Sequence, residues 1–163
     1  MKNLLIVYHS KTGGTAQMAE AALRGAATES GTQTHLIRAG DASPDDVLAA
    51  DGYIFAAPEN LAALAGVMKD FFDRTYYPVL ERINGRPYGL LICAGSDGAG
   101  AVRQIQRIAT GWRLKAVADP IIVCTRAQTP ETILAQKVIG ETDLARCRDL
   151  GAALAGGLAM GIF

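Results

Sequence analysis

Short apolar runs alternate along this chain with stretches in which apolar residues recur every three or four positions. The runs are rich in β-branched residues and predict strands at 4–8, 34–37, 52–57, 88–94 and 120–124. The periodic stretches predict helices at 16–27, 45–50, 61–75, 101–112 and 143–160. Because strands and helices alternate, and the strands carry few polar positions, we expect a parallel sheet with helices on both faces.

The length and the charge of the chain indicate how many domains it forms and which partners it can bind. The chain has 163 residues, and we expect 1–163 to fold as a single domain. Its 16 basic and 16 acidic residues balance, which argues against nucleic acid or an anionic membrane as a partner. The uncharged tail at 150–163 is shorter than the ~20 residues that span a bilayer, so no membrane span is expected. The opening apolar run is too short for an export signal, and a cytoplasmic protein is expected.

The turn between the first predicted strand and helix has the composition of a phosphate loop. It reads Ser10, Lys11, Thr12, Gly13, Gly14 and Thr15. A phosphate is stabilised at such a place by the free N–H groups and the dipole of the helix, while glycines allow close approach and hydroxyls add donors. The alternative is an ordinary capped turn, but a helix cap needs one hydroxyl and this loop has three. The spacing fits neither the triphosphate loop G-x-x-x-x-G-K-[ST] nor the dinucleotide fingerprint G-x-G-x-x-G.

Two further loops follow strands that end at the same edge of the sheet. The first comprises Pro58, Glu59, Asn60 and Leu61, and the second comprises Gly95, Ser96, Asp97 and Gly98. Ligands of open parallel sheets bind beyond the carboxyl ends of the strands, so both loops are candidates for ligand contact. Each also has a structural interpretation: Pro58 would end a strand, Asn60 would cap a helix, and the glycines would serve a turn.

The string Ser-x-Thr-Gly-x-Thr at 10–15 resembles the FMN phosphate loop of the flavodoxin-like family. Together with the loops at 58–61 and 95–98, the whole chain is similar to the NAD(P)H-dependent FMN reductase and quinone reductase branch of that family. The resemblance implies a doubly wound, five-stranded parallel sheet in the order 2-1-3-4-5. It also implies bound FMN, NAD(P)H as co-substrate, and ring contacts from backbone N–H groups of Asn60, Leu61, Ser96 and Asp97.

Three functions are compatible with this resemblance: a reductase of a quinone, flavin or similar small acceptor, an electron carrier between proteins, and a non-redox scaffold. Carrier flavodoxins are typically acidic and sandwich the ring between aromatic residues, whereas this chain is neutral and has no aromatic residue at 57–63 or 94–101. The sequence therefore favours the reductase. Many such reductases have an aromatic or small polar residue where Glu59 and Asn60 stand, and a carboxylate facing the ring would oppose an anionic reduced flavin.

The other residues that could take part in catalysis or metal binding are interpreted as structural. No acid–base pair stands out, so no catalytic side chain is predicted, because the cofactor itself accepts hydride. His9 is interpreted as a polar residue beside the phosphate loop. The odd number and wide spacing of Cys93, Cys124 and Cys147 predict neither disulfides nor a metal site.

Two parts of the chain leave questions open. Tyr76 and Tyr77 are predicted either to line a substrate pocket, of their own chain or of a partner subunit, or to close a helix end. With the apolar tail they are candidate contacts of a homodimer or tetramer. Residues 125–142 give no clear pattern, although Pro130 and Glu131 could open a helical turn.

Overall fold

The computed structural model describes residues 1–163 and contains a mainly parallel sheet. Its principal strands are β1 (Lys2–Tyr8), β2 (Thr32–Arg38), β3 (Gly52–Asn60), β5 (Pro87–Ala94) and β7 (Ile121–Cys124). They lie in the order β2-β1-β3-β5-β7, with the two-residue strand β6 (Lys115–Ala116) also on β5. The predicted order 2-1-3-4-5 is confirmed.

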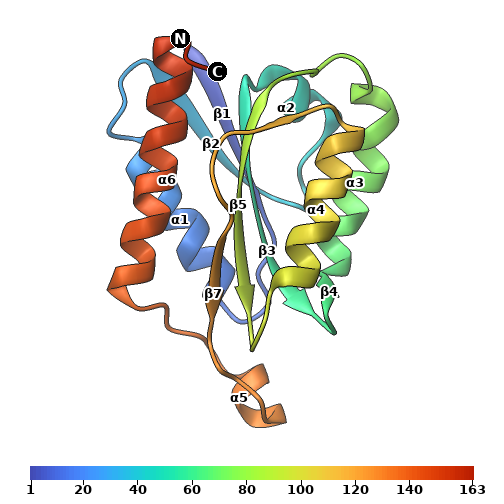
Figure 1. Ribbon diagram of the computed structural model, residues 1–163, viewed down its shortest axis with the longest axis vertical. Helices are drawn as coiled ribbons and strands as arrows, with labels where there is room; N and C mark the ends of the chain where they lie inside the picture. Colours follow the sequence, from blue (N-terminus) through green and yellow to red (C-terminus); the bar gives the residue numbers. More distant parts are fainter.

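Helices cover both faces of this sheet, as Figure 1 shows. On one face lie α1 (Gly14–Ala26) and α6 (Glu141–Met160), and on the other lie α2 (Pro44–Ala49), α3 (Gly66–Val79) and α4 (Ala99–Gly111). The short helix α5 (Pro130–Leu134) lies beyond the carboxyl ends of the strands, at the edge opposite both chain termini. The layered α/β class expected from the sequence is therefore correct.

The two faces of the sheet have different cores. Beneath α3 and α4, aromatic rings gather around Phe55, whose ring centroid lies 5.0 Å from that of Phe72 and 6.3 Å from that of Trp112. Beneath α1 and α6 the buried residues are aliphatic or small, with several alanines. Most of the aromatic residues thus lie in one core, whereas Tyr8, at the end of β1, packs against the aliphatic core on the other face.

Small residues let α1 and α6 approach closely. A side-chain carbon on Gly25 would lie 1.9 Å from the carbonyl oxygen of Arg148, and one on Gly151 would lie 1.9 Å from that of Ala22. Both distances are far inside van der Waals contact, so these helices pack backbone against backbone. This contact fixes the position of α1 and hence of the loop that precedes it.

The chain after β3 differs from the prediction. Pro58 does not end the strand, which continues to Asn60 and turns back into β4 (Ala63–Leu64) as an antiparallel hairpin. Beyond Ala56, β3 has lost β1 as a neighbour, and a proline is tolerated on such a free strand edge. Helix α3 accordingly begins at Gly66 rather than near 61, and Asn60 does not cap it.

Helix α3 carries Tyr76 and Tyr77 away from the ligand edge. Their rings pack against each other with centroids 5.0 Å apart, near the end of the helix, and Tyr77 is exposed. Their interpretation as walls of a pocket within this chain is therefore wrong. No helix of the structure is both long and apolar enough to cross a membrane.

The contact between α1 and α6 yields a stability prediction. Gly151→Ala should lower the free energy of unfolding by about 1–3 kcal/mol, because the added methyl group forces two backbones apart. The control is Gly111→Ala at the end of α4, where an added carbon meets nothing within 4 Å. Urea denaturation of both variants makes the comparison, and an equally stable Gly151→Ala protein would contradict the packing argument.

Candidate functional site

The phosphate loop predicted from the sequence leaves the start of α1 open. Gly13 precedes the helix with φ 89°, a left-handed conformation that favours glycine, and no side chain caps the first turn. The Ser10 hydroxyl accepts a hydrogen bond from the Gly13 N–H at 3.1 Å, which closes the loop on itself. The following N–H groups of α1 remain directed at the ligand edge, with the positive end of the helix dipole behind them.

A cavity of about 100 Å³ lies over this helix start. It is lined by Ser10, Lys11, Thr12, Gly14, Thr15, Pro58, Asn60, Cys93, Ile133 and Leu134. The structure thus brings together most of the phosphate loop and two residues of the 58–61 segment. Cys93, Ile133 and Leu134 were not predicted as site residues. Cys93 is buried, and burial raises the pKa of its thiol to about 11, so it lines the cavity as an uncharged group.

Glu59 has a role that the sequence did not reveal. Its carboxylate accepts hydrogen bonds from the N–H groups of Gly98 at 3.0 Å and of Ala101 at 3.1 Å. The residue that precedes α4 is Gly98, which has no side chain to cap the helix, and a carboxylate is stabilised there by the helix dipole. The charge that the sequence placed beside a flavin ring is therefore bound to α4, and it ties the β3–β4 hairpin to the 95–98 loop.

The other ring-loop candidates lie outside the cavity. The Leu61 side chain is fully exposed at the hairpin tip, and Ser96 and Asp97 are exposed. The Gly98 N–H is occupied by Glu59. The Asp97 carboxylate accepts from the N–H of Ala99 at 3.2 Å, so it faces its own helix start. These residues remain candidates for ring contact only through backbone groups at the rim.

His9 directly follows β1, and its backbone N–H donates to the carbonyl of Ala56 at 3.0 Å. Burial lowers the pKa of the His9 imidazole below its usual 6.5, and the positive charges of Arg38 and Lys11 lower it further. The ring is therefore neutral at neutral pH, which agrees with the interpretation of His9 as a polar neighbour of the phosphate loop rather than a proton donor.

Residues 125–142, which show no clear sequence pattern, contribute directly to the site. Thr129 caps α5 in a capping box with Thr132, and Pro130 occupies its first turn, so the suggested helical turn is present. Beyond α5, the Lys137 N–H donates to the carbonyl of Thr12 at 2.7 Å. Only the short capping motif was readable from the sequence, because the rest of this segment is fixed by contacts with a loop far away in the chain.

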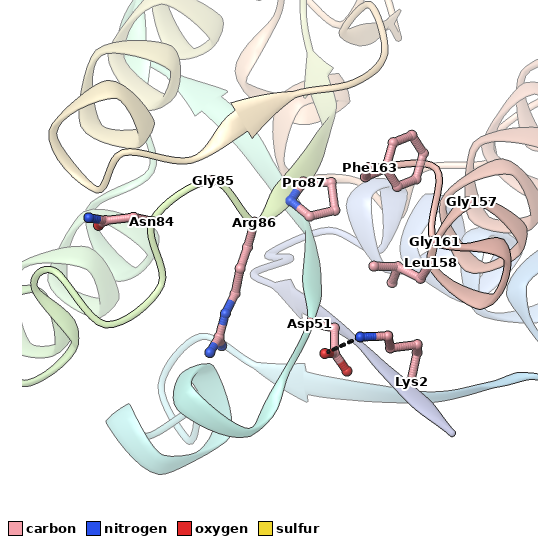
Figure 2. Close-up of a pocket in the computed structure, with 10 residues that line it drawn as sticks. All are labelled: Lys2, Asp51, Asn84, Gly85, Arg86, Pro87, Gly157, Leu158, Gly161 and Phe163. Atoms are coloured by element: carbon pink, nitrogen blue, oxygen red, sulfur yellow. Dashed lines mark hydrogen bonds and ion pairs between the residues drawn. The ribbon is translucent and has the colours of Figure 1, made fainter.

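A larger hollow of about 230 Å³ lies at the opposite edge of the sheet, where the chain termini meet (Figure 2). Its charged groups already have partners: Lys2 pairs with Asp51 at 3.2 Å, and Arg86 turns toward α2, where it donates to the carbonyl of Leu48 at 2.9 Å. Ligands of such sheets bind at the carboxyl ends of the strands, so the smaller cavity is the candidate site.

The residues at the candidate site fit the phosphate end of FMN. An uncapped helix start, a left-handed glycine and three hydroxyl-bearing residues surround one cavity, as the binding of a phosphate requires. The enclosed volume suits the phosphate and adjoining chain, and a flat ring would lie over the open rim.

Known proteins resemble this chain in sequence. The model of the NADPH-dependent FMN reductase family matches residues 41–128. A flavodoxin from Aquifex aeolicus is 36% identical over 100 residues, which is 61% of this chain and 52% of that protein. An NAD(P)H dehydrogenase (quinone) from Acidithiobacillus ferrooxidans is 35% identical over 95 residues, covering 46% of this chain and 48% of that protein. The matches thus span about half the length of these curated relatives.

Solved structures share the fold over nearly the whole chain. A flavodoxin from the domain Archaea superposes with a TM-score of 0.77 at 20% identity, covering 96% of this chain and 98% of that one. A flavodoxin, WrbA-like protein from Agrobacterium tumefaciens gives a TM-score of 0.75 at 21% identity, with 99% of both chains covered. At these identities the likeness establishes the flavodoxin-like fold.

The position of Glu59 yields a prediction about the loops at the rim. Glu59→Gln should lower the free energy of unfolding by about 1–3 kcal/mol, because the amide loses the charge and one of the two acceptors at α4. Asp97→Asn is the matched control, since asparagine still caps a helix. Thermal and urea denaturation measure both variants. Equal stability of the two would show that the Glu59 contacts contribute nothing.

His9 yields a prediction about pH. The folded-state pKa lies below the unfolded value of 6.5, so the unfolded chain binds more protons as the pH falls through 6.5. Stability from the neutral ring is therefore complete above pH 6.5 and is lost below it. An NMR titration of the His9 ring should give a pKa under 6.5, and His9→Gln should flatten the loss of stability on acidification. A measured pKa at or above 6.5 would contradict the burial argument.

Proposed function

The chain belongs to the NADPH-dependent FMN reductase family, and we propose that it is an FMN-dependent oxidoreductase that takes hydride from NAD(P)H. The electrons from NAD(P)H then pass to a small acceptor such as a quinone or a free flavin. We place this activity in the cytoplasm, where nicotinamide cofactors are available. The observation that carries the proposal is the open start of α1, surrounded by the hydroxyl residues Ser10, Thr12 and Thr15.

In this proposal the phosphate loop holds the cofactor by its phosphate. N–H groups of the first turn of α1 and the hydroxyls of Thr12 and Thr15 donate to the dianion, with charge from the helix dipole in support. Pro58 and Asn60, on the extended end of β3, line the same cavity and would lie beside the ribityl chain and the near edge of the ring. Backbone groups at 60–61 and 96–97 are the proposed ring contacts.

When bound, FMN supplies the hydride chemistry, and the protein needs no acid–base pair of its own. The contribution of this chain is to orient the ring and to leave one of its faces accessible. No aromatic residue stands at 57–63 or 94–101 to cover that face. Nicotinamide and acceptor can then stack in turn at hydride-transfer distance.

The chemistry of the rim favours an apolar acceptor. Ile133 and Leu134 line the cavity and are half or more exposed, and Leu61 is exposed at the hairpin tip. Such surroundings suit a quinone or flavin ring better than a strongly charged molecule. The relative from Acidithiobacillus ferrooxidans carries the name NAD(P)H dehydrogenase (quinone), which is in keeping with this choice.

The second candidate is an electron carrier, favoured by the likeness to a flavodoxin from Aquifex aeolicus. A carrier docks on partner proteins, usually through an acidic face that steers it to basic surfaces. The net charge of zero in this chain does not supply such steering. We therefore place the carrier second.

The proposal is tested by flavin binding followed by reduction. The purified protein should bind added FMN with a perturbed visible spectrum, and NADH or NADPH under anaerobic conditions should bleach the flavin bands. A quinone should then restore them. Bound flavin that neither nicotinamide reduces would favour the carrier, and failure to bind FMN would refute the proposal.

Variants of the phosphate loop locate the binding. Thr12→Ala combined with Thr15→Ala should lower FMN affinity at least about tenfold, because each lost donor leaves part of the dianion unpaired, at about 1–3 kcal/mol. The control is Thr110→Ala, whose exposed hydroxyl bonds only within α4. Calorimetry with FMN measures both, and unchanged affinity in the double variant would place the phosphate elsewhere.

A further inference from the structure

Residues 135–139, which join α5 to α6, cross directly over the phosphate loop, and we name this stretch the cover. The Lys137 N–H donates to the carbonyl of Thr12 at 2.7 Å. Ile139, at the end of the cover, is only 5% exposed and belongs to the aliphatic core under α1 and α6. The cover is therefore attached to the loop at one point and anchored in the core at another.

Gln17, on the first turns of α1, clasps the cover with its whole amide group. Its Nε2 donates to the carbonyl of Lys137 at 2.7 Å and to that of Gly13 at 3.0 Å. Its Oε1 accepts from the N–H of Ile139 at 3.0 Å. This one side chain thus binds the loop, the middle of the cover and the anchored end of the cover. It therefore fixes the distance between the cover and the start of α1.

The cover fills the space beside the two glycines of the loop. A side-chain carbon on Gly13 would lie 2.0 Å from Nε2 of Gln136, and one on Gly14 would lie 3.4 Å from Cβ of Lys137. The Lys137 ammonium donates to the carbonyls of Ile133 at 2.8 Å and Ala135 at 2.6 Å. These bonds join the cover to α5, and two residues of α5, Ile133 and Leu134, line the cavity.

We propose that the cover selects a flavin that ends at its phosphate, FMN, over a flavin dinucleotide. This inference rests on the proposed function, in which the phosphate lies at the start of α1. A dinucleotide continues beyond that phosphate into a second phosphate and an adenosine, and the space beside the glycines is taken by the side chain of Gln136 and the Cβ of Lys137. FMN has nothing to place there, and FAD must displace the cover.

The side chain of Gln17 holds the cover in place but does not line the cavity, so it can be removed without changing the cavity wall. Gln17→Ala eliminates three hydrogen bonds and leaves the hydroxyls of the loop in place. The loosened cover should admit FAD more readily, so that the ratio of the FAD to the FMN dissociation constant falls by about tenfold or more. Gln136→Ala, at an exposed position, should change the ratio in the same direction without affecting the anchor.

The experiment is calorimetric titration of the wild type and both variants with FMN, FAD and riboflavin. Gln106→Ala on α4 is the matched control, because it removes the same side chain from an exposed helix position remote from the loop. Circular dichroism checks that each variant is folded. If Gln17→Ala fails to fold, Gln136→Ala alone decides the question.

The outcomes separate this inference from the proposed function. A strong FMN preference in the wild type that narrows in either folded cover variant and not in Gln106→Ala supports the cover as the selecting element. Equal affinities of the wild type for FMN and FAD, or a ratio unchanged in every folded cover variant, would overturn it while leaving the oxidoreductase intact. Riboflavin that binds as tightly as FMN would instead refute the phosphate site and, with it, the proposed function.

Discussion

The helices α1 and α4 begin at the same edge of the sheet, and each presents the positive end of its dipole there. Only the start of α4 receives a carboxylate from a neighbouring segment of the chain. Gly13 and Gly98 precede α1 and α4 with nearly equal φ angles, 89° and 90°, and neither helix has a capping side chain at that position. At α4 the carboxylate of Glu59 supplies the missing negative charge. At α1 no carboxylate does so, and hydroxyls and glycines surround the opening instead. The positive end of α1 therefore suits an anion from outside.

This division also explains the form of the β3–β4 hairpin. To reach α4, β3 must run past Ala56, where it loses β1 as a neighbour, and then turn back within two residues. Both turn residues, Leu61 and Ala62, have positive φ angles, which non-glycine residues seldom adopt. The strain is offset by contacts on either side: Pro58 accepts from the N–H of Ala65, and Gln104 accepts from that of Leu64. The hairpin thus holds Asn60 at the cavity.

Local patterns were sufficient to predict the parallel sheet and its covering helices, because these depend on short runs or regular spacing of apolar residues. The order of the strands followed instead from the resemblance to a known family. Local patterns failed where distant contacts override local preference. Nothing at 61–62 resembles the Asn-Gly pair that usually marks a two-residue hairpin, so a helix was predicted there. The direction of Glu59 depends on α4, and the cover depends on Gln17, more than a hundred residues away in the chain. Of the candidate site, the loop at 10–15 could be proposed from the sequence, whereas its contacts with the cover could not.

Helix α1 connects the phosphate loop, the cover and α6. Its packing against α6 therefore affects the position of its amino end. The contact of Gly25 with the backbone of Arg148 holds α1 against α6, and α6 begins directly after the cover. The helix that offers its dipole to an anion also clasps the cover through Gln17 and packs against the helix that follows it. A shift of α1 along α6 would move the N–H donors and the cover together, since the same amide group joins them. Close packing of small residues in the aliphatic core is therefore a condition for a fixed geometry of the proposed phosphate site.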